Sequence, residues 1–298
     1  MIRLATFNVE NLFARYRFRR NFDPVGSDGF SINDTAFSIH GETAKQITAR
    51  VIKAANADIL ALQEVDNLKV LDRFVSRYLG GMQYKHKILI DAFDPRNIDV
   101  ALISRYPIIS IKTYRHERNQ RNTASLFSRD CLEVDIDVNG KTMTVYVNHF
   151  KSMMGGRDET HNRRKEQANR VSTIITDRWG DNNFEGNYAV VGDFNDYLEG
   201  QSSISELTGH PGLTNISDRI PEEDRWTHFW ASGNKYSQID FILLSPQLKE
   251  QNANAPEILR KGLPYRATKY DGERFDAVGE NTPKASDHCL LYVDIELV

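Results

Sequence analysis

The stretch Val190-Val191-Gly192-Asp193-Phe194-Asn195-Asp196 decides the fold of this chain, because it reads as a buried strand with a chemically distinctive end. Apolar residues run up to Gly192, and two polar side chains, Asp193 and Asn195, follow two positions apart. Strand side chains repeat every two residues, so a carboxylate and an amide point the same way at one sheet edge. Either residue alone is a common turn former. The interpretation therefore depends on how the other strands end.

Five further predicted strands also carry polar side chains at one end. Asn8 and Glu10 follow a strand from Ile2 to Phe7, Glu64 follows Ile59 to Leu62, His149 follows Met143 to Val147, Asp240 lies in Gln238 to Leu244, and Asp287 and His288 precede Cys289 to Ile295. Nine such residues at six strand ends exceed what turn formation alone explains. Their hard oxygen donors suit Mg²⁺ or Mn²⁺. The sequence shows no Cys/His cluster with zinc spacing, no P-loop and no nucleophile elbow.

Composition sets the broad class of the protein. The chain has 298 residues, of which 40% are hydrophobic and 27% charged, and we predict one α/β domain over residues 1–298. A net charge of −3 argues against a uniformly basic nucleic-acid binder. The two cysteines, Cys131 and Cys289, lie in apolar runs and are expected to be buried and reduced. No membrane span or signal peptide is visible, which favours a cytoplasmic protein, or a secreted one if a leader has been removed.

Hydrophobic periodicity predicts the remaining elements. Helices are expected over 42–55, 68–79 and 159–179, and strands over 84–90, 99–104 and 108–114. Cys131 to Val138 and Met143 to Val147 should form a hairpin around Asn139-Gly140. A second hairpin is expected to pair 226–231 with 238–244 around Ser232-Gly233-Asn234. Residues 249–281 show no clear period.

The polar strand ends, taken together, resemble the endonuclease/exonuclease/phosphatase family. The matching stretches are Thr6 to Leu12, Leu62 to Val65, Asp99 to Ile108, Asn148-His149-Phe150, Gly192 to Asp196, Ile239 to Leu243 and Ser286-Asp287-His288. They occur in the family's order and cover the whole chain. The resemblance implies a four-layer α/β sandwich, in which two packed mixed β-sheets are flanked by helices, as in deoxyribonuclease I.

The resemblance also implies a metal site. Glu64 would be the principal carboxylate ligand of Mg²⁺ or Mn²⁺. Asn8, Glu10 and Asp287 would lie close to the cation.

The same resemblance implies the catalytic residues of an in-line attack of water on phosphorus. Asp193 would orient or deprotonate the water, and Asn195 would hold a phosphate oxygen. His288 would face the scissile phosphate, paired with Asp240, which fixes its tautomer and favours its protonated form. His149 would be a second histidine on the phosphate side.

Local positive charge favours DNA as the substrate. Three segments, 15–20, 115–129 and 151–170, are rich in basic residues although the whole chain is acidic, and such patches bind phosphate backbones. Besides Asn195, we expect Lys151, Arg129 and Arg164 to contact substrate. Arginine-rich helices are also commonly no more than solvated faces.

Two other functions remain open. A phosphoesterase for a small or lipid-linked phosphate is less favoured, because the sequence suggests no exposed apolar hairpin suited to lipid. A catalytically silent binding domain is disfavoured, because every expected catalytic position is filled. We expect no membrane insertion, and no protein partner can be inferred.

Overall fold

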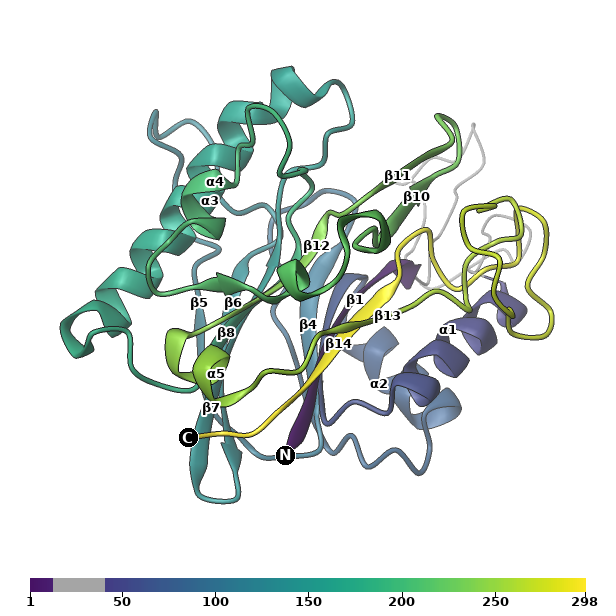
Figure 1. The fold of residues 1–298 in the computed structure, drawn as a ribbon, viewed down its shortest axis with the longest axis horizontal. Coiled ribbons are helices and arrows are strands. Elements are labelled where there is room, and N and C mark those ends of the chain that lie inside the picture. Colours follow the sequence, from purple (N-terminus) through teal and green to yellow (C-terminus); the bar gives the residue numbers. More distant parts are fainter. Residues whose placement is uncertain (13–40) are drawn as a thin grey trace, which may run out of the picture.

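The computed structural model describes residues 1–12 and 41–298, and it shows two six-stranded β-sheets packed face to face (Figure 1). The first sheet has the order β13-β14-β1-β2-β4-β3, with β1 (Ile2–Leu12), β2 (Ile59–Val65), β3 (His86–Leu89), β4 (Asp99–Ser104), β13 (Glu257–Leu259) and β14 (Leu290–Ile295). The second has the order β5-β6-β7-β8-β12-β9, with β5 (Ile108–Thr113), β6 (Cys131–Val138), β7 (Lys141–His149), β8 (Tyr188–Asp193), β9 (Thr214–Asn215) and β12 (Asp240–Leu244). Each sheet is mixed, because β1 and β2 run parallel, as do β7 and β8, while the other neighbours are antiparallel.

Helices cover the outer faces of both sheets (Figure 1). On the first sheet lie α1 (Glu42–Ala55) and α2 (Leu68–Tyr78), and on the second lie α3 (Arg157–Trp179) and the short α4 (Ser205–Thr208). The remaining helical elements are α5 (Pro246–Gln251), η2 (Gly180–Asn182), η3 (Ile216–Arg219) and η4 (Glu222–Asp224). The expected four-layer sandwich of two mixed sheets flanked by helices is confirmed. No helix in the described ranges is long and apolar enough to cross a membrane.

Side-chain alternation builds a core on each face of the sheets. In β1, Leu4 packs into the apolar layer between the two sheets, whereas Ala5 and Phe7 pack into the layer under α1 and α2. In β8, Val191 faces the other sheet and Val190 faces the α3 side. Central strands buried on both faces read as continuous apolar runs, which is why their polar ends stand out in the sequence.

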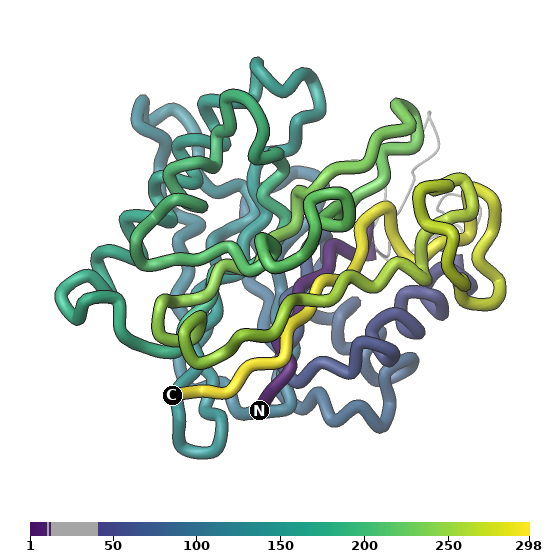
Figure 2. Tube along the Cα trace, viewed as in Figure 1, coloured from purple at the N-terminus to yellow at the C-terminus, as the bar shows by residue number. Residues whose placement is uncertain are grey.

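The predicted second hairpin is wrong in its pairing. Its turn is where we expected, but β10 (His228–Trp230) pairs with β11 (Lys235–Ser237), and this two-stranded ribbon projects from the body (Figure 2). The strand β12 pairs instead with β8 and β9. All five residues of β12 are buried, so burial places this strand inside the large sheet, while the more polar β11 stays at the surface.

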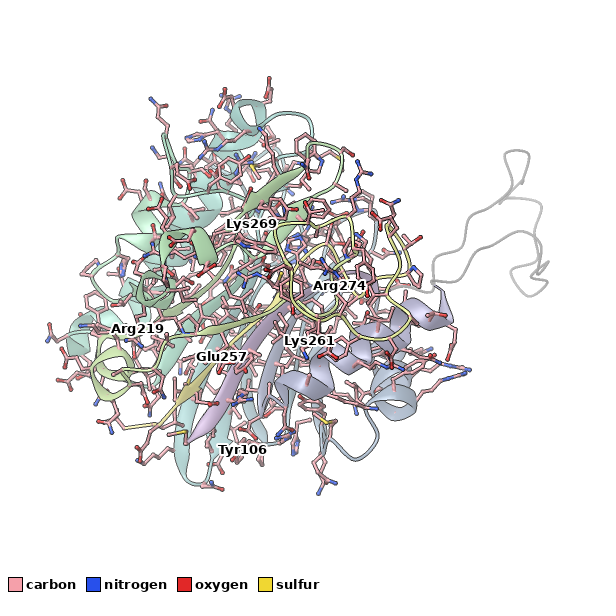
Figure 3. The ribbon with its side chains drawn as sticks, turned by 45° about the vertical axis from the view of Figure 1, so that its right-hand side comes forward. Tyr106, Arg219, Glu257, Lys261, Lys269 and Arg274 are labelled. Atoms are coloured by element: carbon pink, nitrogen blue, oxygen red, sulfur yellow. The ribbon has the colours of Figure 1, made fainter. Side chains whose placement is uncertain are left out.

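The long connection between β13 and β14 packs against α1, as Figure 3 shows for the part of the chain that carries Lys261 and Arg274. Val278 and Ala285 of this connection belong to the same apolar cluster as the buried face of α1. It also contributes to a small cluster beneath the ribbon, where Leu263 packs with Trp226 and Phe229. Cys131 and Cys289 are both free and buried, as predicted.

Gly192 is required where β8 approaches β7. Its φ is +137°, and a Cβ atom there would lie 1.9 Å from the carbonyl oxygen of Asn148. Gly192→Ala is therefore expected to lower the free energy of unfolding by roughly 2 kcal/mol or more, measured by urea denaturation. Gly140→Ala is the matched control, because Gly140 also has positive φ (+88°) but nothing lies within 4 Å of the added atom. Equal losses in both variants would show that the close approach is unimportant.

Candidate active site

The polar strand ends meet at one edge of the sandwich. Carboxyl ends of β1, β2, β7 and β8 lie beside the amino ends of the antiparallel strands β12 and β14. The two sheets are joined there by Asn8, whose side-chain amide donates to Asp193 Oδ2 over 3.1 Å. The fold thus brings together residues that are up to 280 positions apart between Asn8 and His288.

Asp193 lies at the centre of this group. Sheet register places it directly opposite His149 on one neighbouring strand and Asp240 on the other. Asn195 donates its backbone N–H to Oδ1 over 2.8 Å and its side-chain amide to Oδ2 over 3.0 Å. Burial raises the pKa of Asp193 to about 7, with His288 opposing the rise and Asp240 adding to it. A carboxylate with such a pKa suits a general base near neutral pH.

His288 and Asp240 form the pair that the sequence predicts. Nδ1 of His288 lies 2.9 Å from Asp240 Oδ2, and Nε2 lies 3.9 Å from Asp193 Oδ2. Thr227 donates its hydroxyl to Asp240 Oδ2 over 2.7 Å and so fixes the carboxylate. Burial lowers the pKa of His288, but the carboxylates of Asp240 and Asp193 outweigh it and hold the pKa well above the usual value. His288 is therefore an imidazolium, with Nε2–H directed away from Asp240.

His149 is a different kind of histidine. It is 3% exposed, its Nδ1 has no hydrogen-bond partner among the residues that the structure describes, and Nε2 lies 3.4 Å from Asp193 Oδ2 and 3.9 Å from Glu64 Oε1. Burial first, and then the charge of Arg129, lower its pKa well below the usual value. His149 is therefore neutral where His288 is charged. The two rings can serve as a hydrogen-bonding group and a cation, respectively.

Irregular backbone at the strand ends orients the carboxylates of Glu10 and Glu64. The pairing of β1 with β2 shifts register after Asn8, and that of β2 with β4 shifts after Gln63. Glu10 and Glu64 sit at these irregularities with φ of +45° and +65°. Strained backbone of this kind is held in place only by its surroundings and clusters at functional sites.

The carboxylate set fits a hard divalent cation. Burial raises the pKa of Glu10 to about 7 and that of Glu64 above its usual value, and Asp287 adds to both increases. Carboxylates that repel one another in this way are stabilised by a shared cation. With the amide of Asn8, they offer the all-oxygen donor set that Mg²⁺ and Mn²⁺ prefer.

Two compact triads of metal-type ligands occur in the part of the chain that the structure describes. Asp193, Asp240 and His288 form one, and His228, Asp287 and His288 form the other, each with ligand atoms within 4.8 Å of one another. Both include His288, whose positive charge disfavours a cation at the same place. The carboxylates around Glu64 therefore fit the metal better than either triad, although Glu64 belongs to neither.

The three basic residues expected to bind substrate, Lys151, Arg129 and Arg164, differ in how far they reach the surface. Lys151 is partly exposed, and burial followed by the charges of Arg129 and Arg96 lowers its pKa. Arg129 is buried behind the site, where it bonds Asp94 Oδ2 over 3.1 Å and the carbonyl oxygen of Phe150 over 2.6 Å. Arg129 therefore holds the backbone beside the site in place and does not face the solvent.

The structure does not bring Arg164 to the substrate face. Its side chain is fully buried, and it donates to Thr160 Oγ1 over 2.5 Å, to Ser203 Oγ over 3.1 Å and to the carbonyl oxygen of Arg157 over 2.8 Å. Its charge is matched by Asp196 at 3.5 Å. Arg164 is thus a structural arginine, and the expectation that it contacts substrate does not fit its position. The arginines of 15–20 lie outside the described residues.

Sequence reasoning missed four residues of the site. Thr227 holds Asp240, and His228 lies against His288 with ring centroids 4.6 Å apart and the ring planes tilted by 47°. Arg96 carries a partly exposed guanidinium within electrostatic reach of Glu64, and Lys284 pairs with Glu10. Burial lowers the pKa of His228 to about 4, so this ring is neutral. The sequence could have indicated Lys284, because it lies two positions before the motif Ser286-Asp287-His288. His228 begins β10 and Thr227 directly precedes it, in the segment 226–231 that we had paired with the wrong strand.

Comparison with known proteins agrees with the motifs. The sequence profile described as "Endonuclease/Exonuclease/phosphatase family" matches residues 3–215. No curated protein matches this sequence. An endonuclease/exonuclease/phosphatase from Beutenbergia cavernae DSM 12333 is structurally similar, with a TM-score of 0.65 and 16% identity over 99% of this chain and 71% of that one.

Two other solved structures are similar over nearly their full length. The human Nocturnin catalytic domain with bound sulfate has a TM-score of 0.64 and 15% identity, and the alignment covers 100% of this chain and 94% of that one. An endonuclease/exonuclease/phosphatase from Bacteroides vulgatus has a TM-score of 0.64 and 18% identity, with 100% and 99% covered. At these identities the likeness establishes the fold alone.

Proposed function

The chain belongs to the endonuclease/exonuclease/phosphatase family, whose members are hydrolases of phosphoester bonds, and from this premise we propose that it is a divalent-metal-dependent phosphodiesterase acting on DNA. The observation that carries the proposal is the arrangement around Asp193. A carboxylate with a pKa of about 7 lies within 4 Å of a charged histidine, His288. A base that titrates near neutral pH therefore lies beside a cationic acid.

The chain's own groups divide the reaction between them. Asp193 orients a water molecule and accepts its proton as the water oxygen attacks phosphorus and the bond between phosphorus and the leaving oxygen breaks. The imidazolium of His288 stabilises negative charge on the phosphate oxygens, and Asp240 keeps it protonated. Asn195 donates its side-chain amide to Asp193 and to the carbonyl oxygen of Phe150, 3.2 Å away. These bonds use both amide N–H groups, so contact with a phosphate oxygen would replace one of them.

A bound Mg²⁺ or Mn²⁺ ion would supply further neutralisation of charge on the phosphate and the leaving oxygen. Glu64 and Asn8 would hold it, with Asp287 nearby. The ion would act together with Asp193 and His288, which would not be among its ligands.

Cations beside the site favour a polyanionic substrate. Arg96 is 44% exposed in its side chain and pairs with Asp94, and Lys151 is partly exposed on the strand end that follows His149. Arg96 exerts positive charge on Glu64 and His149, and Lys151 lies close enough to Arg96 for their charges to interact. Phosphates flanking the scissile bond would be drawn to such groups.

A lipid-linked phosphodiester is the second candidate, because one observation favours it. The sequence suggested no exposed apolar hairpin, but the structure places Trp230 on the β10–β11 ribbon with 51% of its surface exposed. Tryptophan at an exposed ribbon suits a membrane interface. Lys235 lies opposite Trp230 in the same ribbon.

A substrate panel tests the proposal. Supercoiled plasmid, bis-p-nitrophenyl phosphate and a detergent-dispersed phosphodiester lipid are assayed with Mn²⁺, with Mg²⁺ and with EDTA. We expect kcat/KM on plasmid to exceed that on the small diester by at least about 10-fold, because extra phosphates are bound, and EDTA to remove the activity. Full turnover in EDTA would contradict metal dependence. Preference for the lipid, lost on Trp230→Ala, would replace DNA with the second candidate.

A further inference from the structure

We propose that a cavity beside the active site binds one unpaired nucleobase of the substrate, next to the phosphate that is cleaved. The inference rests on the proposed function, hydrolysis of DNA, and deepens it, because it names the form of DNA that the enzyme prefers. None of the residues assigned to the reaction lines this cavity.

The cavity adjoins the reacting groups. Its volume is about 790 Å³, and its walls come from the loop after β8, the β10–β11 ribbon and the connection between β13 and β14. Of its lining residues, Tyr197 comes four positions after Asp193 and Gln238 comes two positions before Asp240. In the second sheet β8 lies between β7 and β12. The cavity is therefore on the β12 side of Asp193, whereas Lys151 follows β7 on the other side.

Three aromatic side chains line the cavity, and each is held by the protein itself. Tyr236 stacks on Phe229 with ring centroids 4.9 Å apart, and its ring meets that of Trp226 edgewise, also at 4.9 Å. The guanidinium of Arg157 lies over the ring of Tyr197, 4.5 Å from its centroid. Fixed aromatic rings bind planar heterocycles by stacking, and this works for every nucleobase. The walls therefore suit a base and need no rearrangement to receive it.

Gln238 offers a hydrogen-bond donor to such a base. Its Nε2 atom is buried and has no hydrogen-bond partner among the residues that the structure describes. A buried donor without an acceptor lowers the stability of the folded chain, so native structures contain few of them. All four DNA bases carry an acceptor, O2 of a pyrimidine or N3 of a purine. A base in the cavity would supply the acceptor that the amide of Gln238 lacks.

The charges of the cavity favour an uncharged ligand over a phosphate group. Three exposed carboxylates line it, from Glu199, Glu222 and Glu223. Two of its three basic residues are already bonded, since Arg225 donates to Asp218 over 3.0 Å and Lys269 (Figure 3) donates to the carbonyl oxygen of Glu223 over 2.8 Å. Lys235 is the third and is exposed. A phosphate would meet more negative than available positive charge, whereas a base carries no charge.

Binding of one base in this way selects unpaired DNA. A base inside a duplex is stacked on both faces and paired along its edge, so it can reach the rings of Tyr197 and Tyr236 only by leaving the stack. Leaving the stack costs free energy, and it costs least where the DNA is already single-stranded. The enzyme should therefore prefer DNA that is unpaired next to the cleaved bond.

The test compares dinucleotides that differ by a single base. The substrates are thymidylyl-(3′→5′)-thymidine and two analogues, in each of which one thymine is replaced by hydrogen. All three carry one phosphodiester and the same charge. With Mn²⁺ in excess, we expect the wild-type kcat/KM to fall on the order of 10-fold when the thymine on one side is removed, because its stacking is lost. A single-stranded oligonucleotide should also be cleaved faster than its fully paired duplex.

Two variants connect this loss to the cavity. In Gln238→Met and in Tyr197→Ala, removing the same thymine should lower kcat/KM by only about 3-fold, because one contact with the base is already absent. Gln238→Met should keep or raise Tm, since it removes an unpartnered buried amide, and a purely structural role would lower Tm instead. Tyr265→Ala is the matched control and should keep the full loss. Tyr265 also has an arginine over its ring, Arg274 at 4.8 Å, but it does not line the cavity.

The outcomes separate this inference from the function on which it rests. If the dinucleotide is hydrolysed but removal of either thymine changes kcat/KM by less than about 2-fold, the cavity does not bind a base, although hydrolysis of DNA stands. An undiminished loss in both variants would overturn it as well, and if Tyr197→Ala does not fold, Gln238→Met decides. Faster cleavage of the duplex than of the single strand would overturn the preference for unpaired DNA. A wild type that hydrolyses neither the dinucleotide nor plasmid would instead overturn the proposed function.

Discussion

Asp193→Asn is expected to lower kcat on the order of 10³-fold, which is within the range for removing a positioned general base. The amide keeps the size of the carboxylate and can still accept the backbone N–H of Asn195, which now lies 2.8 Å from Oδ1. It cannot accept a proton from water. Steady-state kcat on the best substrate of the panel, with Mn²⁺ in excess, measures the loss.

The pH profile connects this loss to the chemistry. Because burial raises the pKa of Asp193 to about 7, wild-type activity should increase as the pH rises through that value and the carboxylate ionises. The residual activity of Asp193→Asn should lack this increase. A profile with the same acidic limb in both proteins would assign the limb to another group and remove Asp193 from the role of base.

Thermal melting of the metal-free proteins is the control for folding. A carboxylate whose pKa is raised in the folded state contributes stability below its unfolded value, near 3.8, and that contribution is lost as the pH rises to about 7. Asparagine removes this penalty above pH 7, but it also deprives the amides of Asn8 and Asn195 of the acceptor Oδ2. The two effects oppose each other, so Tm at pH 8 should change little while kcat falls.

Local patterns in the sequence were sufficient for most of the fold. Helix α1 and strand β4 begin and end where periodicity predicts, because each has one clear register of buried side chains. The pairing of β12 was not predictable from local pattern, since its partner β8 lies more than 40 residues away and is selected by burial. Short-range hairpin signals gave the correct turn for the ribbon and the wrong second strand.

In the candidate site, too, the residues within motifs could be predicted, whereas the residues placed by contacts between distant segments could not. Asp193, Asp240 and His288 could be placed together because strand ends converge at a sheet edge and because the family resemblance supplied their roles. Arg164 could not be separated from surface arginines, because its fully buried position depends on contacts with Ser203 and Asp196, distant in sequence. Lys284 was missed for the same reason, since only the folded chain brings it to Glu10.

His288→Ala is expected to lower kcat on the order of 10²-fold or more, the usual scale for a positioned acid–base group. Asp240→Asn should have a smaller effect with a distinctive pH dependence. The carboxylates of Asp240 and Asp193 hold the pKa of His288 well above its usual value despite burial. The active imidazolium is therefore present at neutral pH and is lost as the pH rises through that elevated pKa. Removing the charge of Asp240 should move the alkaline limb of kcat to lower pH.

The double variant completes the cycle. Asp240 lies 2.9 Å from His288 Nδ1, its bond from Thr227 holds it in place, and its charge also raises the pKa of Asp193. If Asp240 acts through the histidine, then Asp240→Asn combined with His288→Ala should be little slower than His288→Ala alone. Thr227→Val offers a milder perturbation of the same carboxylate and should move the limb in the same direction by less. Multiplicative losses in the double variant, with no shift of the alkaline limb in Asp240→Asn, would mean that the two residues act independently.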